Sequence, residues 1–240
     1  SLGRTRNKIE KLQAENDKLR LTLQNRKNAD ALLKQLKGVL DLAGTAGYKV
    51  VGAKVISHGS TTSYTQSITI DVGSNSGVRS NMTVLSGYGL VGVVKYVYPN
   101  SALVQLASDP AFRIGARIAG SQQIGILSGQ GTRRGVLQLL DNRTQIRKGD
   151  VLLARGSQGG RPFVPGVPIG SVTDVDNSPG AVTQTADVKF YTNFSTLGVV
   201  AVVVSGEGTD PRDALVPPKP IPTPIPTVTV FVTPSPSPTN

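Results

Sequence analysis

Apolar residues recur at coiled-coil spacing near the start of the chain. Written as heptads, Ile9, Asn16 and Leu23 occupy position a, and Leu12 and Leu19 occupy position d. Ile at a, Leu at d and one buried Asn at a favour a two-stranded coiled coil. We therefore predict a helix over residues 1–43 whose seam, formed by these five residues, joins the chain to itself in a homodimer or a higher assembly. A single amphipathic helix lying on its own domain is the alternative, because two to three heptads fall short of the usual length.

The heptad frame slips in the second half of this helix. Arg26 and Asp30 fall on the seam, and the apolar stripe then resumes over residues 32–40. Such a slip indicates either a local change of supercoil or a switch to packing on the globular part of the chain.

Short β-branched runs replace the helical pattern over residues 44–204. Gly44–Gly47 (GTAG) end the helix, and candidate strands follow at a spacing typical of an all-β protein, with glycine-rich turn signals between them. Two barrels of about six strands each accommodate these strands and leave no exposed edges. We predict a mainly β fold, with a first barrel at 44–120 and a second at 121–204. The alternative is that the last strand returns to the first barrel.

The last part of the chain, residues 205–240, is rich in Pro, Thr and Ser. Such a segment buries too little apolar surface to offset its ordering entropy, so we predict a disordered, extended tail. Its apolar insert Thr227–Val232 (TVTVFV) is either a strand that adds to a sheet edge or an apolar segment without a structural role.

The charge of the chain points to an anionic partner. The net charge is +11, and residues 1–40 hold ten Lys and Arg against four acids. Nucleic acid, an anionic membrane surface and an acidic polymer are the possible partners. Aromatic residues interleaved with basic ones are absent, so we expect no nucleic acid among the partners. Nucleic-acid or polyanion binding is the second choice, and a DNA-binding isotherm that depends steeply on salt would promote it.

Catalytic and metal-binding chemistry has little support in the residues. The chain has no Cys, and its one histidine is His58. The run Gly156–Gly160 (GSQGG) lacks the Asp-Ser pair of the serine-protease motif, and a Ser nucleophile needs a His base and a carboxylate. We expect no enzymatic activity, no metal and no cofactor. A degenerate chymotrypsin-like hydrolase is the last alternative.

Five glycine-punctuated segments follow one another along the β region. They are Ile70–Val78 (IDVGSNSGV), Gly89–Val94 (GLVGVV), Gly125–Gly129 (GILSG), Arg147–Leu152 (RKGDVL) and Pro165–Val172 (PGVPIGSV). In this order behind a coiled coil they resemble the MreC family of bacterial rod shape-determining proteins. The motif residues that we single out are Asp71, Gly73, Gly77, Gly89, Leu90, Val91, Gly92, Gly149, Asp150, Pro165, Gly166, Pro168 and Gly170.

The resemblance carries expectations about function and location. It implies a single-pass protein of the cell membrane, whose coiled coil and barrels lie outside the cytoplasm. It also implies a scaffold of cell-wall elongation that contacts a class B penicillin-binding transpeptidase and membrane proteins of the elongation complex. The chain starts at Ser1 without an initiator Met or signal peptide, and no segment approaches the roughly 20 apolar residues of a spanning helix. We therefore expect it to lack its natural N-terminus.

From the residues themselves we expect structural roles for these motifs. Gly92, in mid-strand, permits close backbone approach or a bulge, and Gly87 and Gly89 suit positive φ in a turn. Gly149-Asp150 is typical of a turn into a strand. Pro165–Pro168 favours an irregular corner that closes a barrel, or, if it is exposed, a partner site.

Overall fold

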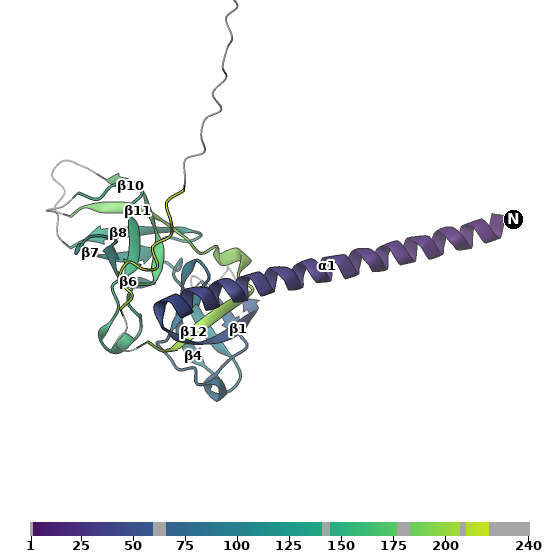
Figure 1. Ribbon diagram of the computed structural model, residues 1–240, viewed down its shortest axis with the longest axis horizontal. Coiled ribbons are helices and arrows are strands. Elements are labelled where there is room, and N and C mark those ends of the chain that lie inside the picture. Colours follow the sequence, from purple (N-terminus) through teal and green to yellow (C-terminus); the bar gives the residue numbers. More distant parts are fainter. Residues whose placement is uncertain (1, 60–65, 141–144, 177–182, 207–209, 221–240) are drawn as a thin grey trace, which may run out of the picture.

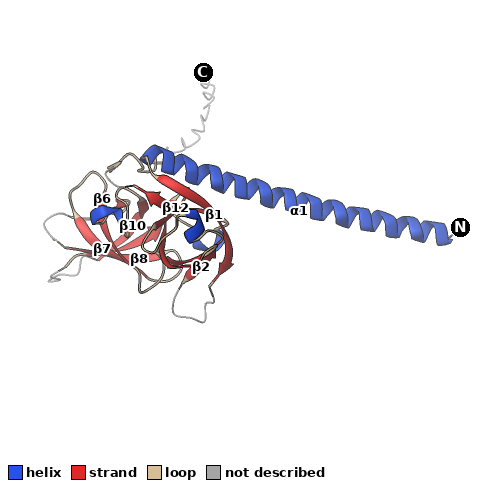
Figure 2. Ribbon diagram, turned by 90° about the horizontal axis from the view of Figure 1, so that it is seen from below, coloured by secondary structure: helices blue, strands red, loops and turns tan. Residues whose placement is uncertain are grey.

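The computed structural model describes residues 2–59, 66–140, 145–176, 183–206 and 210–220, with side chains from Arg4 onward. Within these ranges the chain forms one long helix, α1 (Leu2–Ala46), and twelve strands that close into two barrels (Figures 1 and 2). The prediction of an N-terminal helix followed by two six-stranded β-barrels is confirmed.

The first barrel contains β1 (Lys49–His58), β2 (Ser67–Ile70), β3 (Thr83–Ser86), β4 (Gly89–Val97), β5 (Ala102–Leu106) and β12 (Val199–Ser205). Its antiparallel strands close in the order β1-β12-β3-β4-β5-β2. The second barrel contains β6 (Arg113–Ile118), β7 (Ile124–Gly129), β8 (Arg134–Leu139), β9 (Val151–Ala154), β10 (Pro168–Asp176) and β11 (Thr185–Phe190). Its order is β10-β11-β8-β7-β6-β9. Three short 3-10 helices, η1 (Ser74–Ser76), η2 (Gln158–Gly160) and η3 (Phe194–Thr196), lie in the connections.

The second barrel is inserted between two strands of the first. The predicted boundary after residue 120 places Arg113–Ile118 in the first barrel, whereas β6 pairs with β7 and β9 in the second. The last strand, β12, pairs with β1 and β3 of the first barrel, which is the alternative that the sequence leaves open. Residue alternation shows which face of a strand is buried, but it does not show which strand lies beside it.

Helix α1 ends in a Schellman motif. The Tyr48 amide donates to the Ala43 carbonyl at 3.0 Å, and the Gly47 amide donates to the Gly44 carbonyl at 3.2 Å. Gly47 has φ 75°, the left-handed conformation that glycine adopts most readily. Ala43 and Tyr48, the positions whose apolar side chains accompany this cap, are both buried. The chain therefore turns directly from the helix into β1.

The slip in the heptads marks where α1 meets the first barrel. Val39, Ala43 and Ala46 are buried, and Leu36 and Leu42 are partly buried against the same core, while residues 4–31 are exposed. The exposed part projects away from both barrels (Figures 1 and 2). The second apolar stripe is thus a packing face, although Leu33 and Leu40 remain exposed. The alternative of a helix lying entirely on its own domain is wrong for residues 4–31.

The described beginning of the tail is ordered against the rest of the chain. Residues 210–217, which we call the tail strap, contact the second barrel, and Leu215 packs against the core. The predicted disordered tail starts at residue 205, so the prediction is wrong for the strap. Its remainder beyond residue 220, including Thr227–Val232, lies outside the described residues.

Candidate interaction surfaces

The predicted seam lies on the free part of α1. Ile9, Leu12, Leu19 and Leu23 are 51%, 56%, 63% and 55% exposed, and Asn16 is exposed beside them. No other segment of the described chain covers this stripe, because residues 4–31 are exposed along the whole helix. An apolar stripe at heptad spacing on a free helix is the surface that a coiled coil buries. Pairing of two copies through this seam stays a prediction.

One glutamine attaches helix α1, which we call the stalk, to the first barrel. The Gln35 Oε1 atom accepts from the backbone amides of Gly198 and Val199, both at 2.9 Å. Its Nε2 donates to the Thr196 carbonyl at 3.0 Å. The side chain therefore pairs with three backbone groups at the entry to β12. Sequence reasoning missed Gln35, since a lone amide on a polar helix carries no signal of partners 161 to 164 residues away.

A groove runs along α1 on either side of the point where the helix crosses the β3–β4 turn. One part, of about 570 Å³, is lined by helix residues from Ala31 to Asp41, by Ser86–Tyr88 and by the β11–β12 connection. The other part, of about 510 Å³, is lined by Leu42, Thr45, Tyr191 and residues 214–218. The tail strap thus forms one wall of this groove.

Several motif residues meet where the two barrels join. A Cβ atom at Gly89 would lie 2.1 Å from the Pro168 carbonyl oxygen, so only glycine permits this approach of β4 to β10. The hydroxyl of buried Tyr48 donates to the Pro165 carbonyl oxygen, and burial raises the pKa of that hydroxyl. The buried hydroxyls of Ser86 and Thr192 lie 2.9 Å apart across the same junction. The junction is therefore closely packed and polar groups in it are paired.

The Pro165–Pro168 segment belongs to this junction. Gly166 and Pro168 are buried, and the Gly166 amide donates to the Ala154 carbonyl at 2.8 Å. Thr83 of the first barrel donates to the Pro162 carbonyl at 2.8 Å and accepts from the Val164 amide at 3.1 Å. The segment is a buried corner rather than an exposed partner site.

The remaining motif residues shape the barrel walls and turns. A Cβ atom at Gly73, Gly92 or Gly170 would lie within 2.2 Å of a carbonyl oxygen on a neighbouring strand or loop. Gly77 and Gly149 have φ of 84° and 90° in turns. The carboxylates of Asp71 and Asp150 accept from the backbone amides of Lys54 (2.7 Å) and Arg147 (2.8 Å), and Leu90 and Val91 are fully buried.

Gly87 departs from the expectation of positive φ. Its backbone is not in the left-handed region, whereas Gly89 has φ 138°. Gly87 instead lies against the backbone of Gly38 in α1, where a Cβ atom would come within 2.9 Å of the Gly38 carbonyl carbon. The absence of a side chain at Gly87 thus lets the helix backbone cross close to the turn.

The residues considered for catalysis lie on different barrels. His58 is exposed at the end of β1 in the first barrel. Ser157 lies in the β9–β10 connection of the second barrel, where its amide donates to the Phe163 carbonyl at 2.8 Å. Across the described ranges, no three His, Asp or Glu side chains are grouped as a metal site requires. None of the helices in that part of the chain is long and apolar enough to span a membrane.

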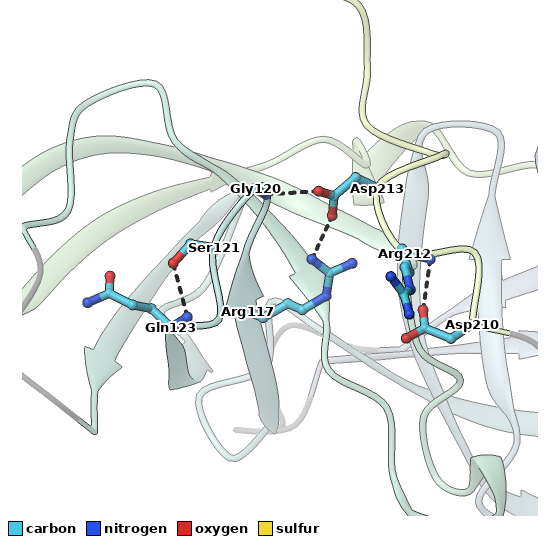
Figure 3. Close-up of polar contacts among 7 residues, drawn as sticks. All are labelled: Arg117, Gly120, Ser121, Gln123, Asp210, Arg212 and Asp213. Atoms are coloured by element: carbon cyan, nitrogen blue, oxygen red, sulfur yellow. Dashed lines mark hydrogen bonds and ion pairs between the residues drawn. The ribbon is translucent and has the colours of Figure 1, made fainter.

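The middle of the strap is held by a carboxylate-binding site on the second barrel that sequence reasoning also missed; Arg117 and the Gly120 amide form this site, which we call the anion pocket. The Asp213 carboxylate accepts from Arg117 Nη1 at 2.6 Å and from the Gly120 amide at 2.9 Å (Figure 3). These hydrogen bonds, with that of Arg117 the largest effect, hold the pKa of Asp213 below its ordinary value. Arg117 and Asp213 lie 96 residues apart, and neither stands in a motif.

These features define a stalk-and-barrel protein, in which a projecting helix carries two joined β-barrels and presents surfaces for contact. The family model for the barrel core of the rod shape-determining protein MreC matches residues 55–204. The chain belongs to the MreC family.

Two relatives are similar to this chain in sequence. The cell shape-determining protein MreC of Listeria monocytogenes is 31% identical over 176 residues, which cover 71% of this chain and 59% of that protein. Its counterpart in Streptococcus pneumoniae is 30% identical over 176 residues, covering 70% of this chain and 64% of that protein. The chain thus spans less than two thirds of the length of either relative.

Solved structures of the family share the fold. MreC from Pseudomonas aeruginosa superposes with a TM-score of 0.58 at 27% identity, covering 65% of this chain and 99% of that one. A chain from the complex between penicillin-binding protein PBP2 and MreC of Helicobacter pylori superposes with a TM-score of 0.52 at 18% identity, over 65% of this chain and 99% of that one. The second likeness concerns the fold alone.

Proposed function

We propose that this chain is a non-enzymatic scaffold of the machinery that elongates the bacterial cell wall. In this proposal it lies outside the cytoplasm as part of a single-pass membrane protein. The stalk pairs two copies, and the double barrel organises a class B penicillin-binding transpeptidase together with membrane proteins of the elongation complex. Family membership supports the role in cell shape, since the related proteins carry that name. The Helicobacter pylori complex supports the choice of a penicillin-binding protein as partner.

The exposed seam carries the proposal. Residues 4–31 make no contribution to the barrel cores, yet they keep four large apolar side chains at heptad spacing. At about 1.5 Å per residue, the 45-residue helix is roughly 68 Å long, so it holds the barrels at a distance from the start of the stalk. Pairing through this seam would place two double barrels side by side, and two linked binding sites raise the effective affinity for a partner assembly.

Sedimentation equilibrium across a concentration range tests the pairing. Leu19→Asp puts a charge at position d, and we expect it to convert a dimer or larger species into a monomer with folded barrels. Leu21→Asp is the matched control, because Leu21 is 66% exposed on the same helix but falls outside positions a and d. Unchanged association of Leu19→Asp would show that the seam is not the interface.

Binding to the soluble part of a class B penicillin-binding protein tests the scaffold role. Surface plasmon resonance with immobilised transpeptidase should detect the wild-type chain, and Leu19→Asp should dissociate faster because it binds through one double barrel only. If neither chain binds, the proposed partner is wrong, whatever the state of association.

A further inference from the structure

We propose that the pocket formed by Arg117 and Gly120 recognises acidic peptides, and that the tail strap occupies it until an acidic segment of a partner protein displaces the strap. The strap would then regulate access to a docking site on the second barrel. This inference does not depend on pairing of the stalk.

Both groups of the pocket belong to the second barrel. Arg117 stands in β6, and with the strap in place its side chain is 16% exposed. The following turn is held by hydrogen bonds from the Ala119 amide to the Val151 carbonyl (2.9 Å) and from the Ser121 amide to the Ile118 carbonyl (3.1 Å). This turn directs the Gly120 amide toward the Asp213 carboxylate (Figure 3). A guanidinium beside a backbone amide binds carboxylates and phosphates, and the contacts of Asp213 show that a carboxylate fits this site.

Asp213 accepts from only some of the hydrogen-bond donors that the pocket offers. It engages Nη1 of Arg117, whereas Nη2 is buried and has no hydrogen-bond partner within the described residues. An arginine can bind a carboxylate through two parallel hydrogen bonds, and a buried donor left unpaired is costly. A carboxylate that reaches both nitrogen atoms would therefore bind more tightly than Asp213 does.

A second, apolar contact lies two residues farther along the strap. Leu215 is half-buried against the core, in the part of the groove lined by Leu42, Thr45 and Tyr191. The strap thus presents a carboxylate and, two positions later, an aliphatic side chain. The chemistry that the surface fits is a peptide that turns as the strap does, with Asp or Glu followed at the second position by an aliphatic residue.

The strap can leave without opening either barrel. It contributes no strand to the two closed sheets. Its own backbone bonds are local, from the Ala214 amide to Pro211 (3.0 Å) and from the Val216 amide to Asp213 (3.1 Å). Arg212, next to the anchor, has φ 51°, a strained conformation for a residue other than glycine. Asp213 itself is 45% exposed, so a competing carboxylate has access to the pocket.

Fluorescence anisotropy with a labelled peptide of residues 210–218 (DPRDALVPP) tests the pocket on the full chain. The tethered strap competes at an effective concentration of about a millimolar, so wild type should bind the peptide weakly. Asp213→Lys repels the strap from Arg117, and we expect at least a tenfold tighter binding of the peptide. Asp210→Lys makes the same change of charge at a carboxylate that, among the described residues, accepts from the Arg212 amide and not from the pocket, and it should behave as wild type.

Two further variants attribute the binding to Arg117. Adding Arg117→Gln to Asp213→Lys, or replacing the peptide's Asp213 by Asn, should each weaken binding at least tenfold. The Gly120 amide resonance reports whether the strap has left, since its proton is bonded to Asp213 in wild type. If that resonance moves in Asp213→Lys and the peptide still does not bind, the proposal is wrong. Equal binding by wild type and Asp213→Lys would also overturn it.

A mixing experiment distinguishes a partner protein from a second copy of the chain. Asp213→Lys leaves the pocket open, and Arg117→Gln leaves the strap free. Both are combined with Leu19→Asp to remove pairing through the seam. We expect the mixture to sediment as monomers at concentrations where the peptide is bound. A one-to-one complex would assign the pocket to strap exchange between copies and overturn the choice of a partner protein.

Discussion

The backbone of Gly87 in the β3–β4 turn lies against the backbone of Gly38 in α1. A Cβ atom at Gly87 would lie 2.9 Å from the Gly38 carbonyl carbon and 3.0 Å from its Cα. Two glycines therefore let the stalk helix cross the first barrel at backbone contact. This crossing, the Gln35 hydrogen bonds and buried Val39 together fix the direction in which the stalk leaves the barrels.

Gly87→Ala tests this contact. The added methyl meets helix backbone, which cannot rotate away, so we expect a loss of about 1–3 kcal/mol in the free energy of unfolding, measured by urea denaturation. Gly44→Ala is the control, because nothing lies within 4 Å of a Cβ atom there and alanine favours the helix. An equal stability of Gly87→Ala and wild type would mean that the helix does not rest on the turn.

Gln35→Ala removes three hydrogen bonds at the entry to β12. It leaves the amides of Gly198 and Val199 without their acceptor, and we expect a cost of about 1–3 kcal/mol in urea denaturation. Gln24→Ala, on the exposed part of the helix, removes a hydrogen bond to Asn28 and should change stability little. Hydrogen exchange should show faster exchange at Gly198 and Val199 in Gln35→Ala alone.

Docking of the strap should depend on pH through Asp213. Its pKa is lowered, chiefly by the hydrogen bond from Arg117, so the docked strap favours the ionised form. The stabilisation is fully present above the ordinary carboxyl pKa of about 3.9 and is lost as the pH falls through the lowered pKa of the docked form. The Gly120 amide proton should titrate in this range, and Asp213→Asn should abolish the titration. A titration midpoint above the ordinary value would contradict the contact.

Two truncations separate the free and the packed parts of the stalk. Removing residues 1–30 deletes helix that is exposed from Arg4 onward, and the thermal unfolding midpoint of the barrels should stay the same. Removing residues 1–43 also deletes Gln35 and Val39, and that midpoint should fall because a buried face of the first barrel is uncovered. Equal unfolding of both truncations would mean that the packed half of α1 contributes nothing to the barrels.

Local sequence patterns predicted where the strands lie along the chain, but not which strands pair with one another. Two barrels of about six strands each were predicted and are present, because β-branched runs between turn residues are local signals. The membership of Arg113–Ile118 in the second barrel depends on pairing with β9, for which alternation gives no partner. Gly87 shows a similar limit, since a close approach and a positive φ both select glycine.

The candidate interaction residues follow the same division. Leu12 and Leu19 repeat at a fixed spacing, so their shared face on α1 was predicted. Gln35, Arg117 and Asp213 act through single contacts with residues far along the chain, and they have no periodicity. Such long-range polar pairs become visible only when the fold brings the segments together.

The return of β12 to the first barrel sets an order of assembly. A chain that emerges from its N-terminus presents all strands of the second barrel by Phe190, but the first barrel lacks its closing strand until Ser205 has appeared. Until then β1 and β3, which flank β12, expose unpaired edges. A chain cut short between Phe190 and Ser205 would keep a closed second barrel beside an open sheet in the first. Strands from other chains could then pair with that open sheet.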